Sequence, residues 1–408
     1  MAAVTLALIS AGCAAGVGDP ASKPTKAVAP VLSPAGKSAG EKIVVSRKDC
    51  PEPARTADEF KAASVRSSWK LLSVTDEEQD AVFSYYGFFG GAMASDGALW
   101  ALYDAGEHAG TPVRWKDGRW ERVAMPPGVK TVKALATGPD GKIWAVEPKE
   151  GTWKGGVREG DGWQELTLTV PGGGKEDRPV TAHDGWVSSG ATAVRWDGTS
   201  WERLDLPPGI RYGGMIAEYR LFGPREETWA VPEDESKVVR VRNGVSQMVE
   251  FGLEIDAKEA AHGGGGFDPQ AVVVLGKDET WVLGAATFGA HYVDVDEDTD
   301  AGRMVALRYA QGKWTCMWGP FHRENFNDNF VEAVPDGNGG FWAVTSRYLG
   351  TDSTLWHFSS GRWTRERLPA DEGAEQNVTD LVANGHEIYA LGSIFSRGSF
   401  RGALWRVS

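Results

Sequence analysis

The chain has 408 residues and a formal net charge of −13 at pH 7, with a pI near 5.1. Such acidity argues against nucleic acid as a partner, because phosphate binding needs a basic surface. The sequence contains 52 Gly and 18 Trp, and no long stretch repeats its apolar residues with a helical period. Length alone would allow two or three domains, so the internal pattern has to decide the architecture.

Residues 1–12 form a short run of small apolar residues that stops at Cys13. A membrane-spanning helix needs about 20 apolar residues, so this run does not span a membrane. It resembles the end of a bacterial lipoprotein signal peptide, which implies that segment 1–13 is a signal, that Cys13 is acylated and that the protein sits on the outer face of the cell membrane. Ser10 stands where that family usually has Leu, and no Lys or Arg precedes the run, although secretory segments normally begin with positive charge. Plain secretion, and a cytosolic chain with a chance apolar start, are the alternatives.

Residues 14–48 are rich in Ala, Gly, Pro, Ser and Lys and cannot bury a core. This composition predicts a disordered tether, and the tether with its N-terminal extension covers residues 14–66. If Cys13 carries lipid, Cys50 and Cys316 remain as an even pair of cysteines. They either form one disulfide in an oxidising compartment or stay as two unpaired buried thiols.

Seven aromatic residues recur in similar local sequence after this segment. Most lie 42 to 47 residues apart, and two wider intervals hold insertions: the positions are Trp100, Trp144, Trp186, Trp229, Trp281, Trp342 and Tyr389. Around most of them the sequence reads as a turn, a short apolar strand, an Arg-aromatic strand, a second turn and a Trp-bearing strand. Periods of about 40 to 50 residues with several short strands are typical of β-propellers. We therefore predict an all-β fold of seven four-stranded antiparallel blades, with the recurrent aromatic residues packed between neighbouring blades.

The seventh unit ends at Ser408 without an outer strand, and the missing strand is found near the N-terminus. Residues 67–75 (SSWKLLSVT) match the outer-strand pattern GTSWERLDL of the third unit. Pairing this segment with the last blade closes the ring and covers an exposed edge. We predict a propeller over residues 67–408, closed by a strand that buries Trp69 and Leu71. Because the fourth and fifth units are irregular, six and eight blades are the alternatives.

Three units carry an Asp-Gly-x-x-Trp motif or a close variant, in the segments DGALWAL, DGKIWAV and GGFWAV. The repeat is similar to that of bacterial periplasmic propellers of the two-component-regulator sensor type, over residues 67–408. That resemblance implies a fold far more than an activity. The units also resemble, more distantly, the streptogramin-lyase propellers, but the catalytic His and Glu motif of that family has no counterpart in this sequence.

The connections between strands divide over two faces of the predicted ring. Turns between the first and second and between the third and fourth strands of a blade share one face, the short-turn face, which holds Gly turns such as Asp117-Gly118. The long insertions share the opposite, long-loop face, where function usually resides on a rigid scaffold. We predict ligand contacts on the long-loop face, at His291, Tyr292, His322, Arg323 and Glu324. Solvated loops without a ligand, and a catalytic site on the same face, are the alternatives.

One acidic loop is a candidate for calcium. Asp294, Asp296 and Asp298 alternate as the first three ligands of a calcium loop do. Thr299 stands at the sixth position in place of Gly and Val305 at the twelfth in place of Glu, so a complete EF-hand is excluded. The alternatives are a partial oxygen-ligand site and a solvated loop, and the sequence indicates no other cofactor.

Motifs of common catalytic sites are missing: the sequence has no Gly-x-Ser-x-Gly, His-Glu-x-x-His or Cys-x-x-Cys. We therefore expect an extracytoplasmic binding or scaffolding module for a glycan, peptide or protein ligand. Its contact with a membrane would be limited to the N-terminal lipid. A lyase or hydrolase with its site on the long-loop face is the rival hypothesis.

Overall fold

The computed structural model describes residues 33–35, 42–54, 56–75, 79–80, 87–104, 110–138, 140–149, 152–169, 181–183, 186–189, 192–196, 201–206, 219–224, 226–232, 236–242, 245–253, 266–288, 301–322, 328–347 and 353–408. All regular elements in these ranges are β-strands. The described residues contain no helix that is long and apolar enough to cross a bilayer.

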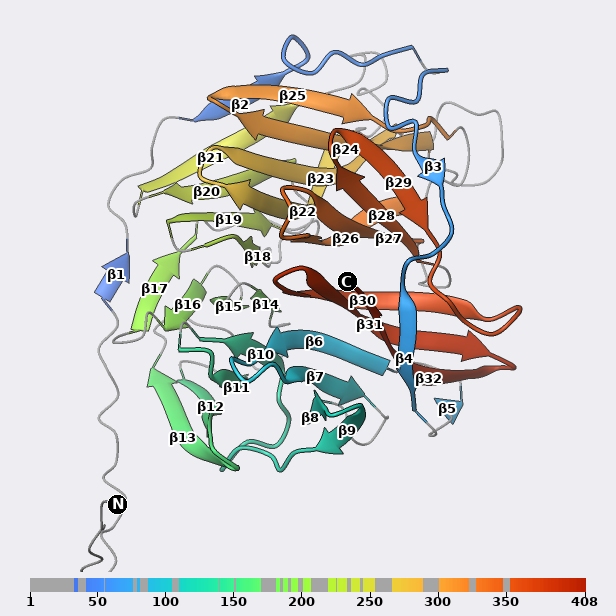
Figure 1. The fold of residues 1–408 in the computed structure, drawn as a ribbon. Helices are drawn as coiled ribbons and strands as arrows, with labels where there is room; N and C mark the ends of the chain where they lie inside the picture. The colour runs from blue at the N-terminus through green and yellow to red at the C-terminus, as the bar shows by residue number, and fades with distance from the viewer. Residues whose placement is uncertain are drawn as a thin grey trace, which may run out of the picture.

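The strands form seven sheets arranged as the blades of a ring (Figure 1). In each blade the first strand in sequence lies at the channel and the later strands lie progressively outward. The first blade contains β6 (Gly87–Met93), β7 (Leu99–Asp104), β8 (Thr111–Lys116) and β9 (Arg119–Arg122). The second contains β10 (Ala134–Thr137), β11 (Ile143–Lys149), β12 (Thr152–Glu159) and β13 (Gly162–Thr169). The third contains β14 (Thr181–His183), β15 (Trp186–Ser189), β16 (Thr192–Trp196) and β17 (Trp201–Asp205).

The remaining blades follow the same order. The fourth contains β18 (Tyr219–Phe222), β19 (Glu227–Pro232), β20 (Lys237–Arg242) and β21 (Val245–Gly252). The fifth contains β22 (Phe267–Gly276), β23 (Glu279–Phe288), β24 (Ala301–Ala310) and β25 (Lys313–Trp318). The sixth contains β26 (Asp328–Pro335), β27 (Phe341–Arg347), β28 (Thr354–Ser359) and β29 (Arg362–Glu366). The seventh contains β30 (Glu375–Asn384), β31 (Glu387–Ser396), β32 (Ser399–Val407) and, as its outer strand, β4 (Lys70–Val74).

The predicted all-β, seven-bladed ring and its closure by an N-terminal strand are confirmed. Strand β4 pairs antiparallel with β32, and a short strand β5 (Gln79–Asp80) extends the pairing. Trp69 is buried, as expected, with 4% of its surface exposed. The prediction for Leu71 is wrong, because 37% of its surface is exposed. A register shift opposite Leu404 and Trp405 changes the alternation, so that Leu72 packs against the core in place of Leu71.

The recurrent aromatic residues occupy the second strand of every blade and are buried, with 0 to 7% of their surface exposed. A cation lies directly across the ladder from most of them, on the third strand. In the fourth blade the guanidinium of Arg240 lies 5.3 Å from the ring centroid of Trp229, and its Nη2 donates to Glu227 Oε1 at 2.7 Å. The same opposition recurs in the pairs Trp100–Arg114, Trp186–Arg195, Trp281–Arg308 and Tyr389–Arg406. The Arg-aromatic strand seen in the sequence is therefore a packing device of each blade.

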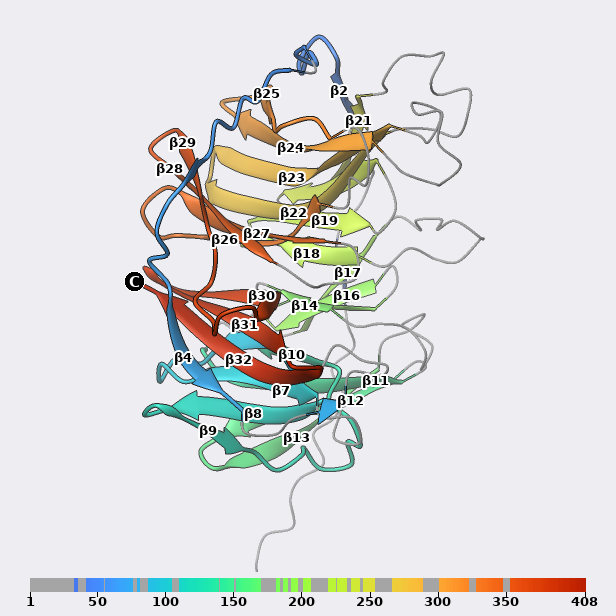
Figure 2. The same cartoon turned by 90° about the vertical axis from the view of Figure 1, so that its right-hand side faces the viewer.

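The N-terminal segment departs from the predicted tether over residues 14–66. Three short strands of this segment pair in parallel with outer strands of the ring: β1 (Ser33–Ala35) with β17, β2 (Ile43–Ser46) with β21, and β3 (Ala63–Ser64) with β29. In Figures 1 and 2 the blue ribbon through β2, β3 and β4 follows the outer rim of the ring. The outer strand of a blade has unpaired backbone N–H and C=O groups, which an extended segment of almost any composition can satisfy. We call the described residues between 33 and 66 the belt.

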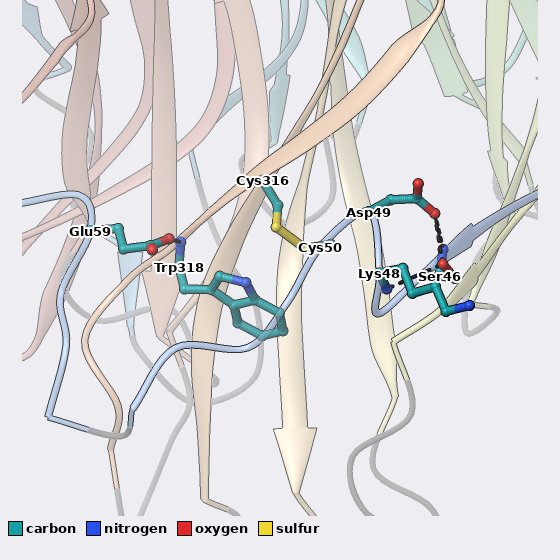
Figure 3. The surroundings of a disulfide bond; sticks show 7 residues. All are labelled: Ser46, Lys48, Asp49, Cys50, Glu59, Cys316 and Trp318. Carbon is teal, nitrogen blue, oxygen red and sulfur yellow. Dashed lines mark hydrogen bonds between the residues drawn. A yellow bond between two sulfur atoms is a disulfide. The ribbon is translucent and has the colours of Figure 1, made fainter.

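The belt is fixed most firmly on the fifth blade (Figure 3), where it is held by a covalent bond. A disulfide joins Cys50 to Cys316 of β25. Nearby, the backbone N–H of Trp318 donates to Glu59 Oε2 at 2.9 Å, and the N–H of Glu59 donates to the Trp318 carbonyl at 2.8 Å. Arg303 is fully buried below this segment and donates to the Ala57 carbonyl at 2.7 Å. The belt therefore links blades three, four, five and six before its chain enters blade seven as β4.

Candidate functional site

The central channel contains a cavity of about 490 Å³. Among the described residues, innermost strands of five blades line it, through residues such as Met93, Thr137, Val274 and Leu381, together with the turn after β18. These residues lie in the second halves of their strands, which run toward the short-turn face. The cavity is thus displaced toward the mouth opposite the one that the sequence favoured.

A polar network crosses the channel on the long-loop side of this cavity. The Arg220 guanidinium of blade four donates to the Val331 carbonyl of blade six at 2.8 Å and to Gln270 Oε1 of blade five at 2.7 Å. Gln270 Nε2 donates to Asp268 Oδ2 at 2.6 Å, and Asn329 Nδ2 approaches the same oxygen at 3.3 Å. All of these groups lie in the first halves of their innermost strands. None of them is among the described residues that line the cavity, so the network and the cavity lie at different depths of the innermost strands.

Asp380 is the one charged side chain among the described residues that line the cavity. Its Oδ2 accepts a hydrogen bond of 2.5 Å from the backbone N–H of Gly91, which connects blade seven to blade one. A Cβ at position 91 would lie 2.3 Å from Val382 Cγ2, so this approach of the two blades requires Gly. Beside it, Thr379 Oγ1 donates to the Phe88 carbonyl at 2.5 Å. The described lining of the cavity therefore offers one carboxylate, which a backbone N–H holds, within a largely apolar wall.

Another titratable pair lies on the short-turn side of blade six. His357 stacks on Trp342 with ring centroids 4.2 Å apart, and its Nε2 lies 2.9 Å from Asp336 Oδ2. Burial opposes ionisation of Asp336, but hydrogen bonds from His357 and from two backbone N–H groups hold the pKa of its carboxyl below the usual value. The carboxylate caps the turn before β27 through the N–H groups of Asn338 and Gly340. Its geometry is that of a turn-stabilising group.

The predicted long-loop residues are only partly within the described ranges. His322 forms an isolated bridge with Gly302, in which the two residues exchange backbone hydrogen bonds of 2.9 and 3.0 Å. Its side chain is half-buried. His291, Tyr292, Arg323 and Glu324 lie outside the described residues, so their grouping around a ligand stays a prediction.

The calcium candidates Asp294, Asp296 and Asp298 also lie outside the described residues, as does Cys13. Within the described ranges, no group of three or more His, Cys, Asp and Glu side chains is arranged to hold a metal ion. The calcium site therefore stays a prediction.

Sequence reasoning missed the channel residues Arg220, Gln270, Asp268 and Asp380. Each lies on the innermost strand of its blade, in a short segment whose sequence resembles that of any other innermost strand. The one available signal was the presence of charged residues in innermost strands whose neighbours are apolar, as in YRLF and TDLV.

Comparison with protein-family models and with curated proteins returned no match. Among solved structures, a streptogramin B lyase is 13% identical with a TM-score of 0.48, over 82% of this chain and 97% of that chain. YCF48 from Cyanidioschyzon merolae is 12% identical with a TM-score of 0.47, over 84% and 98%. A gluconolactonase from Xanthomonas campestris is 11% identical with a TM-score of 0.38, over 80% and 87%. At this level of similarity the comparisons carry no argument about activity, and what the strand pairing establishes is a seven-bladed β-propeller.

Proposed function

We propose that the protein is an extracytoplasmic, lipid-anchored binding propeller that takes a ligand into its central channel. The observation that carries the proposal is the cavity of about 490 Å³, with Asp380 as the charged group among its described lining residues. Concave sites of this size, with apolar walls and few polar groups, are typical of small-molecule binding. One carboxylate in an apolar wall favours a ligand with an apolar body and one cation, such as an amine or the free amino terminus of a peptide.

The disulfide supports the extracytoplasmic part of the proposal. Disulfides persist in oxidising compartments and are rare in the cytosol, and Cys50 and Cys316 are bonded here. The belt begins to pair at Ser33, which shortens the expected tether to the residues between Cys13 and Ser33. At ~3.5 Å per residue, that segment reaches at most about 70 Å from a membrane. The rim that carries β1 would then be the part of the ring nearest the lipid.

A lyase or hydrolase remains the rival function, and the described geometry supports it less well. General acid–base catalysis needs positioned titratable groups within reach of the substrate. The described lining of the cavity presents Asp380 alone, and this carboxylate already accepts a backbone hydrogen bond. Binding is therefore the function that the cavity supports best.

The binding proposal is tested with Asp380→Asn, which keeps an oxygen acceptor for the Gly91 N–H and removes the charge. Short apolar peptides with free and with acetylated amino termini would be titrated by calorimetry against the parent protein and this variant. We expect the free amine to bind at least ten times more tightly than the acetylated form, and the variant to lose this preference. Equal affinity for both peptides, or an unchanged preference in the variant, would refute the role of Asp380.

The anchoring proposal is tested by mass spectrometry of the protein from the membrane fraction of the producing cell. The expected result is a mature chain that begins at a diacylated Cys13. Replacement of Cys13 by Ser should release the protein from the membrane without affecting its folding, because the described ring does not include this residue. A lipid-free protein in the medium, cleaved at another site, would exclude the anchor.

A further inference from the structure

Neighbouring blades of the ring meet through a repeated contact between two Trp side chains. Among the described side chains, four seams have a Trp on, or directly before, the outer strand of one blade that packs edge-on against the second-strand Trp of the blade before it. The ring centroids are 5.2 to 6.4 Å apart in the pairs Trp100–Trp163, Trp229–Trp314, Trp281–Trp363 and Trp342–Trp69. Each pair fills the outer part of its seam, where two blades diverge from the channel.

The seam between blade seven and blade one departs from this pattern. Its second-strand residue is Tyr389, and the outer-strand Trp120 stacks instead on Phe88 of its own blade, with ring centroids 4.2 Å apart. The ring of Trp115 lies 5.4 Å from that of Trp120. The outer part of this seam keeps an open cavity of about 450 Å³ between β4 and blade one. We call it the seam groove; Leu72 to Thr75 form one wall, and the aromatic residues form the other.

The charged residues in the described lining of the seam groove, Arg119 and Arg122, are both cations. The β8–β9 hairpin, residues 111–122, contains four cations and two carboxylates, whereas the chain carries a net charge of −13. Arg119 lies at the groove with 74% of its side chain exposed, and its guanidinium contacts Glu121 at 3.1 Å. An exposed ion pair of this kind contributes little to stability. Its guanidinium is therefore free to exchange Glu121 for a carboxylate of a ligand.

We propose that the seam groove binds a carboxylate-bearing sugar ring of an acidic polysaccharide. The half-buried rings of Trp115 and Trp120 offer flat apolar surface for the C–H face of a pyranose. Arg119 offers the planar pair of donors that suits a carboxylate. A volume of about 450 Å³ is in the range of small-ligand sites and suits one or two sugar units.

A proline-rich peptide is the other ligand that aromatic grooves commonly hold. Such peptides need exposed side-chain donors from the aromatic residues for their carbonyl groups. Here Trp120 Nε1 is buried and Tyr103 is 5% exposed, so neither presents its polar atom at the surface. Two exposed guanidinium groups, of Arg119 and Arg122, lie at the groove instead, which favours an anion.

The test uses the full-length protein and three variants. Arg119→Gln removes the cation, and Trp115→Leu removes an aromatic surface while keeping an apolar side chain. Arg362→Gln is the matched control, because Arg362 precedes Trp363 of blade six as Arg119 precedes Trp120, and it is exposed in a seam whose Trp pair is present. Circular dichroism and melting curves would establish that all three are folded.

Each protein would be titrated by calorimetry with oligogalacturonate, oligoglucuronate, the methyl ester of oligogalacturonate and decaproline. We expect an acid form to bind the parent protein, and Arg119→Gln and the methyl ester each to weaken binding about tenfold. Trp115→Leu should weaken the binding of the acid and of the ester to the same extent, and Arg362→Gln should change the affinity for neither. The proposal is overturned if neither acidic glycan binds, if Arg119→Gln and Arg362→Gln behave alike, or if decaproline binds and the acids do not.

Discussion

Replacing Trp69 by Ala should destabilise the propeller far more than replacing Leu71, although the two residues are almost adjacent. Trp69 is 4% exposed and packs edge-on against Trp342 at 5.2 Å, whereas Leu71 is 37% exposed. Truncation of a buried Trp typically costs ~3–5 kcal/mol, and a half-exposed Leu on an outer strand costs about 1 kcal/mol or less. Unfolding entropy is ~2.1 cal/mol/K per residue, so a ring of roughly 340 residues gives about 0.7 kcal/mol/K.

These values predict that the melting temperature falls by about 4–7 °C for Trp69→Ala and by about 1 °C for Leu71→Ala. Differential scanning calorimetry of both variants at one scan rate is the assay, and Leu71→Ala is the matched control two residues further along the chain. Equal decreases for the two variants would show that the loss comes from weaker pairing of β4 and not from the Trp69–Trp342 contact. No decrease for Trp69→Ala would refute closure through this strand as a source of stability.

Three further predictions rest on described contacts, and a fourth rests on the sequence. Replacing Cys50 and Cys316 by Ala should lower the free energy of unfolding by about 2–5 kcal/mol, and a reductant should destabilise the parent protein but not the variant in thermal melts. Glu227→Gln should cost ~3–5 kcal/mol because it leaves the buried Arg240 charge without this carboxylate, whereas Arg240→Met should cost less, because Arg242 Nε still lies 3.6 Å from Glu227 Oε2. The double variant should cost less than the sum of the two; additive losses in denaturant titrations would contradict this. Burial raises the pKa of Tyr219 to about 12, so the folded state keeps a proton that the unfolded chain loses near pH 10. The free energy of unfolding should therefore decline as the pH rises between these values, and Tyr219→Phe should reduce that decline in melts at pH 9 to 11. Replacing His322 and Glu324 by Ala should weaken the binding of a ligand that enters from the long-loop face. If the affinity is unchanged and binding is lost on changing Asp117, that ligand binds on the short-turn face.

Features that repeat along the chain could be predicted from the sequence, because each blade shows the same local pattern of turn and strand residues. The recurrent aromatic residues mark the second strands, and all of them are buried where the period placed them. Asp117 and Gly118 both take positive φ, 52° and 78°, as a tight Asp-Gly hairpin requires. The predicted burial of Leu71 was wrong because a register shift in the β4–β32 ladder changes which residue faces the core. No local sequence pattern indicates such a shift.

The belt could not be predicted, because its strands are two to four residues long and carry no alternation that a reader could detect. Their partners are edges that form only when the ring is complete. The pairing of Cys50 with Cys316, 266 residues away, was left open for the same reason. The Arg220 network was missed because its members come from three blades, and each looks unremarkable within its own strand.

Both candidate sites involve the seam where the ring closes, and the packing there explains why. The inner half of this seam is joined by polar contacts, from Gly91 N–H to Asp380 and from Thr379 to the Phe88 carbonyl. The outer half lacks the Trp pair that fills four other seams, and a groove remains. The two sites are thus on opposite sides of one blade contact, and separate variants distinguish them. Asp380→Asn should affect ligands of the channel and leave acidic glycans unaffected, whereas Arg119→Gln should do the reverse. If either variant changed both, the two sites would be coupled through movement of β6 against β30, the strands that this contact joins.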